Sequence, residues 1–228
     1  MPKFATAVCF IAVAGLTGCS STMRTYVNTL QLAFNPGADV SLSPAQLANR
    51  QHDALYATVG GLPRAVLGLA YVEQGQQKWQ SADNAMLVLE QGRLVKTTGF
   101  ANDLLYLVAT ADDPLKQPMT AIQPGQQWQS YSDWSLGDSS GYAQQYVITA
   151  IAIQPLQLLQ QQFATKYVTE QVSFANGDTA VNEFWFELKS GQLLKSKQQL
   201  APDWPQVELI HISTAARLAG IVAQGQSK

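Results

Sequence analysis

The sequence predicts a mainly β domain with antiparallel strands, preceded by one or two helices. Three observations lead to this prediction. Runs rich in β-branched and aromatic residues recur through most of the chain after His52. The turns between them are only a few residues long, too short for the helical crossovers that parallel strands need. The stretch before His52 instead carries apolar residues at helical spacing.

Both predicted helices lie in this N-terminal stretch. The first covers 21–34, where apolar residues recur at steps of three and four, as on one face of an amphipathic helix. Asn35-Pro36-Gly37 ends it. Ser43 followed by Pro44 has the form of an N-cap with proline at the first helical position, and predicts a short helix to about Gln51.

Five strands are expected in the first half of the chain, and six in the second. The turns between them include Gly60-Gly61, 91–93 and 176–178, where glycine can supply a positive φ. Trp185 alternates with Phe184 and Phe186, so the indole should face away from the two phenyl rings. The expected strands are 55–59, 65–72, 85–90, 94–98, 104–110, 128–134, 142–153, 163–174, 181–188, 193–200 and 207–212.

Composition excludes several classes of function. Fourteen basic residues against sixteen acidic ones, with no basic block, argue against a nucleic-acid partner. The chain has only two histidines, His52 and His211, and no carboxylate stands at metal-ligand spacing beside either, so no metal site is expected. No phosphate-binding glycine loop is present, and no cofactor is expected.

One motif has the form of a catalytic nucleophile. Residues 137–141 match G-x-S-x-G around Ser139, and Asp203 and His211 follow in the order used by α/β-hydrolases. His52 and Asp83 precede it in the order of chymotrypsin-like proteases. In α/β-hydrolases this motif forms a sharp turn from a strand into a helix that presents the serine. The segment after Ser139 is instead rich in β-branched residues, which predicts a strand. A loop between two strands is therefore expected, and a Ser139 hydrolase is kept as an alternative.

The five tryptophans are candidates for contacts with sugars, because an indole face can stack on the C–H face of a sugar ring. Most buried aromatic side chains fill cores, so we expect at most one or two of the five to touch a ligand. The ligand-binding candidates are Trp79, Trp128 and Trp134.

The first 18 residues have the layout of a cleaved secretory leader. Lys3 precedes a short apolar run over 5–16, which is too short for a membrane-spanning helix of about 20 residues. Leu16-Thr17-Gly18-Cys19 resembles the lipobox of bacterial lipoproteins, in which the cysteine is lipidated and becomes the first residue. An ordinary leader with a chance cysteine is the alternative.

Removal of the leader would leave residues 19–228, a length that fits a single domain. The polar, glycine-containing stretch 220–228 is expected to be a frayed tail. More than one acyl chain at Cys19 would give a stable membrane anchor. Ser20 is not the aspartate that usually retains lipoproteins at the inner membrane, so the outer membrane is expected. Cys9 is lost with the leader, which leaves no partner for a disulfide.

A second resemblance rests on the block 71–88, which contains K-W-x-S-x-D-N-A-M-L-V, and on G-R-L-V-K-T at 92–97. These stretches resemble the YjbF/GfcB family of capsule and exopolysaccharide lipoproteins. The similarity continues through 113–115, Trp128, 131–135, 184–185 and 190–192.

The family resemblance implies a strongly curled antiparallel meander sheet, half-barrel-like, with helices packed against it. It implies a lipid-anchored outer-membrane protein facing the periplasm, encoded with other proteins of a polysaccharide secretion system. It brings no catalytic residues. A non-enzymatic accessory factor in polysaccharide production or export is therefore expected, with polysaccharide and secretion-system proteins as partners. The alternatives are a polysaccharide hydrolase using Ser139 and a carrier for lipid or outer-membrane protein.

Overall fold

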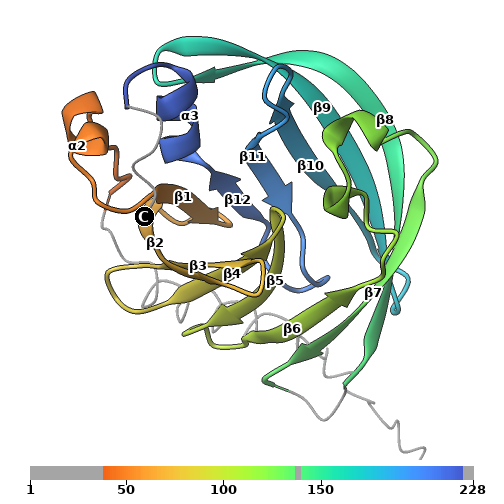
Figure 1. Ribbon diagram of the computed structural model, residues 1–228. Helices are drawn as coiled ribbons and strands as arrows, with labels where there is room; N and C mark the ends of the chain where they lie inside the picture. Colours follow the sequence, from red (N-terminus) through yellow and green to blue (C-terminus); the bar gives the residue numbers. More distant parts are fainter. Residues whose placement is uncertain (1–37, 137–139, 223–228) are drawn as a thin grey trace, which may run out of the picture.

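The computed structural model describes residues 38–136 and 140–222. In this part of the chain, twelve antiparallel strands form one sheet that curls into a nearly closed barrel (Figure 1). The predicted class, a mainly β curled antiparallel meander with few helices, is confirmed. The strands are β1 (Ala54–Val59), β2 (Ala65–Glu73), β3 (Gln76–Gln80), β4 (Met86–Glu90), β5 (Arg93–Thr98), β6 (Leu104–Ala109), β7 (Gln127–Trp134), β8 (Tyr142–Leu158), β9 (Gln161–Phe174), β10 (Thr179–Glu187), β11 (Leu193–Gln198) and β12 (Val207–Ile210).

The strand order explains how the sheet curls back on itself. The order is β5-β4-β3-β2-β1-β12-β11-β10-β9-β8-β7-β6, so the two edge strands are consecutive in the chain. Side chains join them where the connecting loop leaves β5. The Asp103 carboxylate accepts hydrogen bonds from Thr97 Oγ1 and Gly99 N, each 3.0 Å long. Leu104 N donates to Thr97 Oγ1 at 2.8 Å, which ties β6 to β5.

The expected strands are present, but the structure differs from the prediction at one additional strand and at the end of the last one. β3 was not expected, because Gln76–Gln80 holds one apolar residue and lacks the alternation of a typical strand. The expected strand over 207–212 ends at Ile210, and α3 (Ile212–Leu218) follows it. The expected turn glycine Gly92 has a φ of +89°, as predicted.

The short helix predicted from Ser43 is present as α2 (Pro44–Ala48), and it ends at Ala48, before the expected end at about Gln51. Its capping box is complete, since Ser43 Oγ accepts from Gln46 N and Gln46 Oε1 accepts from Ser43 N. Leu47 anchors it on the outside of the barrel against Tyr56 and Ile210. The amphipathic helix expected over 21–34 lies outside the described residues.

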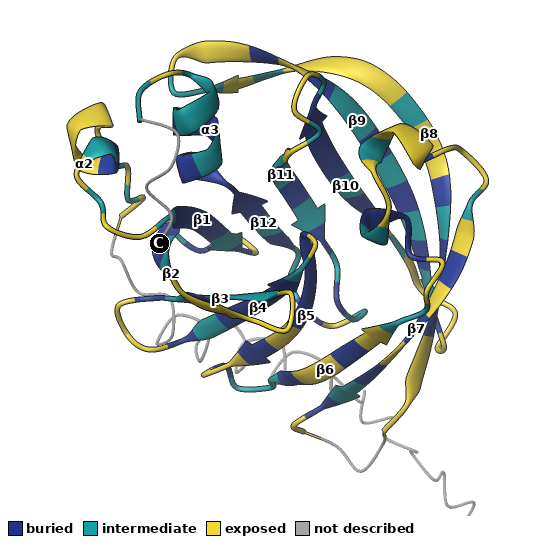
Figure 2. Ribbon diagram, viewed as in Figure 1, coloured by how far each residue is buried: buried dark blue, intermediate teal, exposed yellow. Residues whose placement is uncertain are grey.

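Alternation along the strands separates the barrel interior from its outer surface, as Figure 2 shows. On β10, Phe184 and Phe186 pack in one apolar cluster, while Trp185 contacts Tyr167 on the other face. The predicted opposition of Trp185 to the two phenylalanines is therefore confirmed. On β7 the buried face carries Trp128, Ser130, Ser132 and Trp134.

The segment between β6 and β7 packs against the inner face of the sheet. It contains two short 3₁₀ turns, η1 (Pro114–Lys116) and η2 (Met119–Ala121). Leu115 and Ile122 join the apolar cluster of Phe184 and Phe186. From β9, Lys166 Nζ donates to the carbonyls of Met119 and Ile122 at 2.6 and 2.8 Å. This segment therefore fills part of the space that the curled sheet encloses (Figure 1).

An ion cluster lies at the centre of this filled interior. Arg93 donates to both carboxylate oxygens of Asp113, at 2.8 and 2.9 Å, and to both of Glu170, each at 3.1 Å. Glu170 also accepts from Trp128 Nε1 and from Asn182 Nδ2. Burial would lower the pKa of Arg93, but Asp113 and Glu170 outweigh it and raise that pKa.

Helix α3 packs at one end of the barrel, opposite the loops that join β9 to β10 and β11 to β12 (Figure 1). Ala215 packs with Phe163 and Leu194, and the tip of the long β8–β9 hairpin lies over them through Leu156 and Leu158. Arg217 pairs with Asp53 just before β1. Side chains thus fill this end of the barrel.

Candidate functional site

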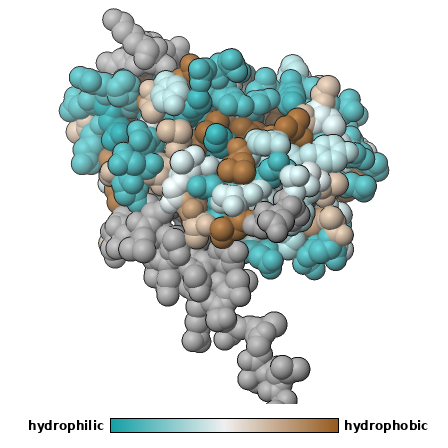
Figure 3. Space-filling view, turned by 90° about the horizontal axis from the view of Figure 1, so that it is seen from below, coloured by the Kyte–Doolittle hydropathy of each residue, from teal (hydrophilic) through white to brown (hydrophobic). Residues whose placement is uncertain are grey.

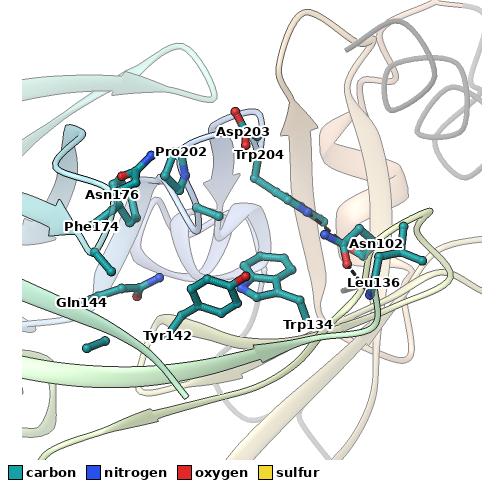
Figure 4. A pocket seen from close by; sticks show the side chains of 13 residues that line it. Asn102, Trp134, Leu136, Tyr142, Gln144, Phe174, Asn176, Pro202, Asp203 and Trp204 are labelled. Carbon is teal, nitrogen blue, oxygen red and sulfur yellow. Dashed lines mark hydrogen bonds between the residues drawn. The ribbon is translucent and has the colours of Figure 1, made fainter. Parts of the chain in front are cut away.

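The other end of the barrel carries a pocket of about 300 Å³ (Figure 4). Four loops surround it, each joining two consecutive strands. They contribute Asn102 from β5–β6, Leu136 from β7–β8, Asn176 from β9–β10 and Asp203 from β11–β12. Because neighbouring strands are antiparallel, alternate loops emerge at the same end, and this places the four together.

Aromatic side chains form much of the pocket wall. The rings of Trp134 and Trp204 have centroids 5.5 Å apart and planes inclined by 44°. Phe100 lies on Trp204 at another 5.5 Å, and Trp204 Nε1 donates to the carbonyl of Asn102 at 3.2 Å. Only 8% of Trp134 and 5% of Trp204 are exposed, so both rings are mostly covered by neighbouring side chains. Tyr142 is 42% exposed and offers the most accessible ring.

Amide and carboxylate groups complete the pocket. Gln144 is buried and its Nε2 donates to the carbonyl of Leu200 at 2.8 Å. Asn102 Oδ1 accepts from Leu136 N at 3.0 Å. Within residues 38–136 and 140–222, no partner is seen for Asn102 Nδ2 or for the exposed Asp203 carboxylate. Asp203 is the one acidic or basic side chain among the described residues that line the pocket.

The structure places the three predicted tryptophans apart. Trp134 lines the pocket, whereas Trp128 lies in the interior, stacked on Tyr146 with centroids 3.7 Å apart. Trp79 meets His211 edge to face at 6.2 Å. Sequence reasoning did not select Trp204, because only the fold brings the β11–β12 loop beside the end of β7.

The candidate catalytic residues are not brought together in the described part of the chain. Ser139 itself lies outside it. Asp203 is at the pocket, but β12 separates it from His211, which is buried at the start of α3. Burial lowers the pKa of His211 to about 4, against a smaller opposing effect of Asp53. His52 is exposed before β1, and Asp83 accepts from Ser81 in the β3–β4 turn.

The described residues provide neither a metal site nor a membrane-spanning helix. Among residues 38–136 and 140–222, no three His, Cys, Asp or Glu side chains gather as metal ligands would. None of the helices in this same part of the chain has the length and apolar character needed to cross a membrane. Cys19 lies outside the described residues.

A second surface feature is an apolar area outside the pocket. Figure 3 views the molecule from below and shows hydrophobic side chains gathered near the middle of that face. The exposed apolar residues on β6, at the lower side of Figure 1, are Leu105, Tyr106 and Val108, and Tyr131 pairs with Val108 from β7. This area lies on the faces of β6 and β7, whereas the pocket is surrounded by loops.

Comparison with known proteins identifies relatives along nearly the whole chain. The chain is 28% identical over 202 residues to the uncharacterized lipoprotein GfcB of Escherichia coli K12, covering 88% of this chain and 94% of that protein. It is 29% identical over 203 residues to the uncharacterized lipoprotein YjbF of the same organism, covering 88% and 93%.

A solved structure agrees with the fold. The crystal structure of the hypothetical lipoprotein YmcC from E. coli K12 aligns with a TM-score of 0.69 and 26% identity, covering 85% of this chain and 96% of that one. A family model described as "Group 4 capsule polysaccharide lipoprotein gfcB, YjbF" matches residues 27–211. The chain therefore belongs to the YjbF/GfcB family of group 4 capsule polysaccharide lipoproteins.

Proposed function

We propose that this protein is a lipid-anchored outer-membrane lipoprotein that faces the periplasm and assists production or export of a capsule or exopolysaccharide without catalysing a reaction. The observation that carries the proposal is the family match over residues 27–211. Cys19 would hold the anchor, and residues 1–18 would be removed. The domain over 19–228 would present its pocket to the polysaccharide.

The pocket supports a contact with polysaccharide through its chemistry. Sugar rings have apolar C–H faces that stack on aromatic rings, and hydroxyls that exchange hydrogen bonds with amides and carboxylates. The pocket offers both kinds of surface, with Tyr142 and Trp134 beside Asn102 and Asp203. Ligand sites in proteins combine apolar walls and a few polar groups in this way.

The filled interior disfavours a lipid carrier. An acyl chain inside the barrel would lie against Arg93, Asp113 and Glu170, each nearly fully buried. Breaking their hydrogen bonds would leave unpaired charges in an apolar surrounding, which is strongly unfavourable. The interior is thus better suited to fixing the shape of the barrel than to holding a lipid.

A hydrolase using Ser139 would need a histidine near its hydroxyl. His211 is buried beyond β12, and His52 is exposed before β1, so neither shares the pocket with Asp203. In this proposal Ser139 serves only as part of the β7–β8 loop. A Ser139→Ala variant is therefore expected to restore polysaccharide output as fully as the unaltered protein does.

The test is deletion of the gene in its own host, followed by complementation. Surface polysaccharide is measured by immunoblot or by uronic-acid and neutral-sugar assay of the cell-surface fraction. We expect the deletion to lower surface polysaccharide, and both the unaltered protein and Ser139→Ala to restore it. Unchanged output in the deletion strain would refute the accessory role, and failure of Ser139→Ala alone would favour the hydrolase.

A further inference from the structure

We propose that the pocket at the barrel end accepts an uncharged sugar residue and discriminates against uronic acids. This inference rests on the proposed contact with polysaccharide and adds the chemical class of the sugar. It follows from the charges of the described lining residues, from the hydrogen-bonding groups of Asn102 and Asp203 that no other described residue engages, and from the size of the pocket.

Charge favours the uncharged sugar. Asp203 contributes a carboxylate to the pocket, and no Lys, Arg or His is among the described residues that line it. A uronate bound there would place two negative charges close together, with no cationic side chain among the described lining residues to offset them. Such a repulsion, even when reduced by water at an open site, corresponds to about a fivefold weaker affinity at a separation of about 4 Å.

Hydrogen bonding points the same way. A carboxylate such as that of Asp203 accepts hydrogen bonds. The hydroxyl groups around the ring of a neutral hexose can donate them. Asn102 Nδ2 offers the complementary donor, while Asn102 Oδ1 is engaged by Leu136 N. A hydrogen bond to an ionised acceptor is roughly twice as strong as one between neutral groups. Asp203 should therefore contribute more to neutral-sugar binding than Asn102 does.

The aromatic residues and the volume define how much of a glycan enters. Tyr142 and the edges of Trp134 and Trp204 provide the stacking surface. About 300 Å³ is at the small end of the range for ligand pockets, which runs from about 300 to 1,000 Å³. The pocket thus suits one or two rings of a chain, with the rest of the polymer outside.

The experiment compares sugars that differ only at C6. The full-length mature lipoprotein is held in a detergent without a sugar headgroup, and ligand-observed saturation-transfer NMR is recorded. The probes are the methyl glycosides of glucose and galactose, each beside its uronate, with the methyl glycoside of N-acetylglucosamine as a third neutral probe. We expect at least one neutral probe to bind about fivefold or more tightly than the uronates.

Two variants with matched controls assign that preference to the pocket. Asp203→Asn should lower the affinity for the neutral sugar. It should also bring the affinities for the neutral sugar and its uronate within about twofold of each other, because the repulsion between two carboxylates is removed. Asp112→Asn removes an exposed carboxylate elsewhere and should leave the preference intact. Tyr142→Ala should abolish saturation transfer to the sugar. Tyr131 is a similarly exposed tyrosine on the outer face of β7, and Tyr131→Ala should leave saturation transfer unchanged.

The inference is overturned by any of three results. These are equal or tighter binding of the uronates, an unchanged preference in folded Asp203→Asn protein, and absence of binding by every neutral probe. Thermal unfolding of each variant checks that it is folded. If the preference is absent while the deletion strain still loses polysaccharide, only the sugar class is wrong. If the preference is found but the deletion strain keeps its polysaccharide, the proposed function is wrong.

Discussion

Arg93 is a single residue that holds the interior of the curled sheet together, through contacts with three other buried side chains. Its guanidinium lies 4.1 Å above the Trp128 ring and binds carboxylates from two distant parts of the chain. Asp113 belongs to the segment between β6 and β7, and Glu170 to β9. One side chain on β5 thereby joins the inner segment to the opposite wall of the barrel. Sequence patterns cannot reveal such a link, because the partners are 20 and 77 residues away.

Replacing Arg93 should reveal how much this link stabilises the fold. Arg93→Met keeps most of the side-chain volume but leaves Asp113 and Glu170 buried without a cation. We expect the free energy of unfolding to fall by about 3–5 kcal/mol in a urea titration. Lys96→Met, an exposed position on the same strand, should change it by no more than about 0.5 kcal/mol. Similar losses for the two variants would contradict this role for Arg93.

The residues of the site were predictable only in part. Trp134 was predicted from its aromatic surface to contact a ligand, and it lines the pocket. Asp203 was noted as a possible catalytic partner and instead lies at the pocket beside Trp204. Asn102, Tyr142 and Asn176 carry no sequence pattern of their own. They meet because four separate loops emerge at one end of the sheet, which is a property of the topology and not of local sequence.

At the scale of single elements, short turns and alternation predicted most strands well. The failures occur where local preference is weak. β3 is mostly glutamine and lysine and is held by pairing with β2 and β4 on both sides. The start of α3 continues an apolar run from β12, so the run alone reads as one strand. Tertiary packing against Phe163 and Leu194 favours the helix there.

The junction of β12 and α3 carries a pH-dependent contribution to stability. His211 is buried, and its pKa is lowered to about 4 from about 6.5 in the unfolded chain. As pH falls below 6.5, the unfolded chain takes up the proton first. The contribution of neutral, buried His211 to the free energy of unfolding is therefore fully present above pH 6.5. It is lost progressively as pH falls through 4, by about 3 kcal/mol in total.

Urea titrations at several pH values between 7 and 4 would test this contribution. His211→Gln cannot take up the proton, so its stability should fall less steeply over this range than that of the unaltered protein. His52→Gln, at an exposed position, should follow the unaltered protein. A His211→Gln curve parallel to the unaltered one would show that His211 does not cause the dependence.

At the scale of the molecule, the two ends of the barrel differ. Helix α3 and the β8–β9 hairpin cover one end, while four loops leave a pocket at the other. The class of fold followed from the short turns, since they favour antiparallel pairing of consecutive strands over parallel crossovers. The joining of the two halves of the sheet did not follow, because the pairing of β1 with β12 links residues about 150 positions apart along the chain.

The proposed anchor gives this asymmetry a function. Lipid at Cys19 would keep the domain near the membrane while its pocket meets polysaccharide in the periplasm. In this account the fold supplies the binding surface, and the lipid supplies its location. Soluble protein should then be inadequate even when it is folded and abundant, because anchoring keeps the local concentration near the membrane high.

The most direct test replaces the anchor and leaves the domain unchanged. A Cys19→Ser variant is secreted behind a cleavable leader that carries no lipobox, so that it accumulates as soluble periplasmic protein, and its amount is matched to the unaltered lipoprotein by immunoblot. Surface polysaccharide of the deletion strain is then measured with each. The account predicts that the lipidated protein restores surface polysaccharide and that Cys19→Ser does not. Full restoration by soluble Cys19→Ser protein would contradict it.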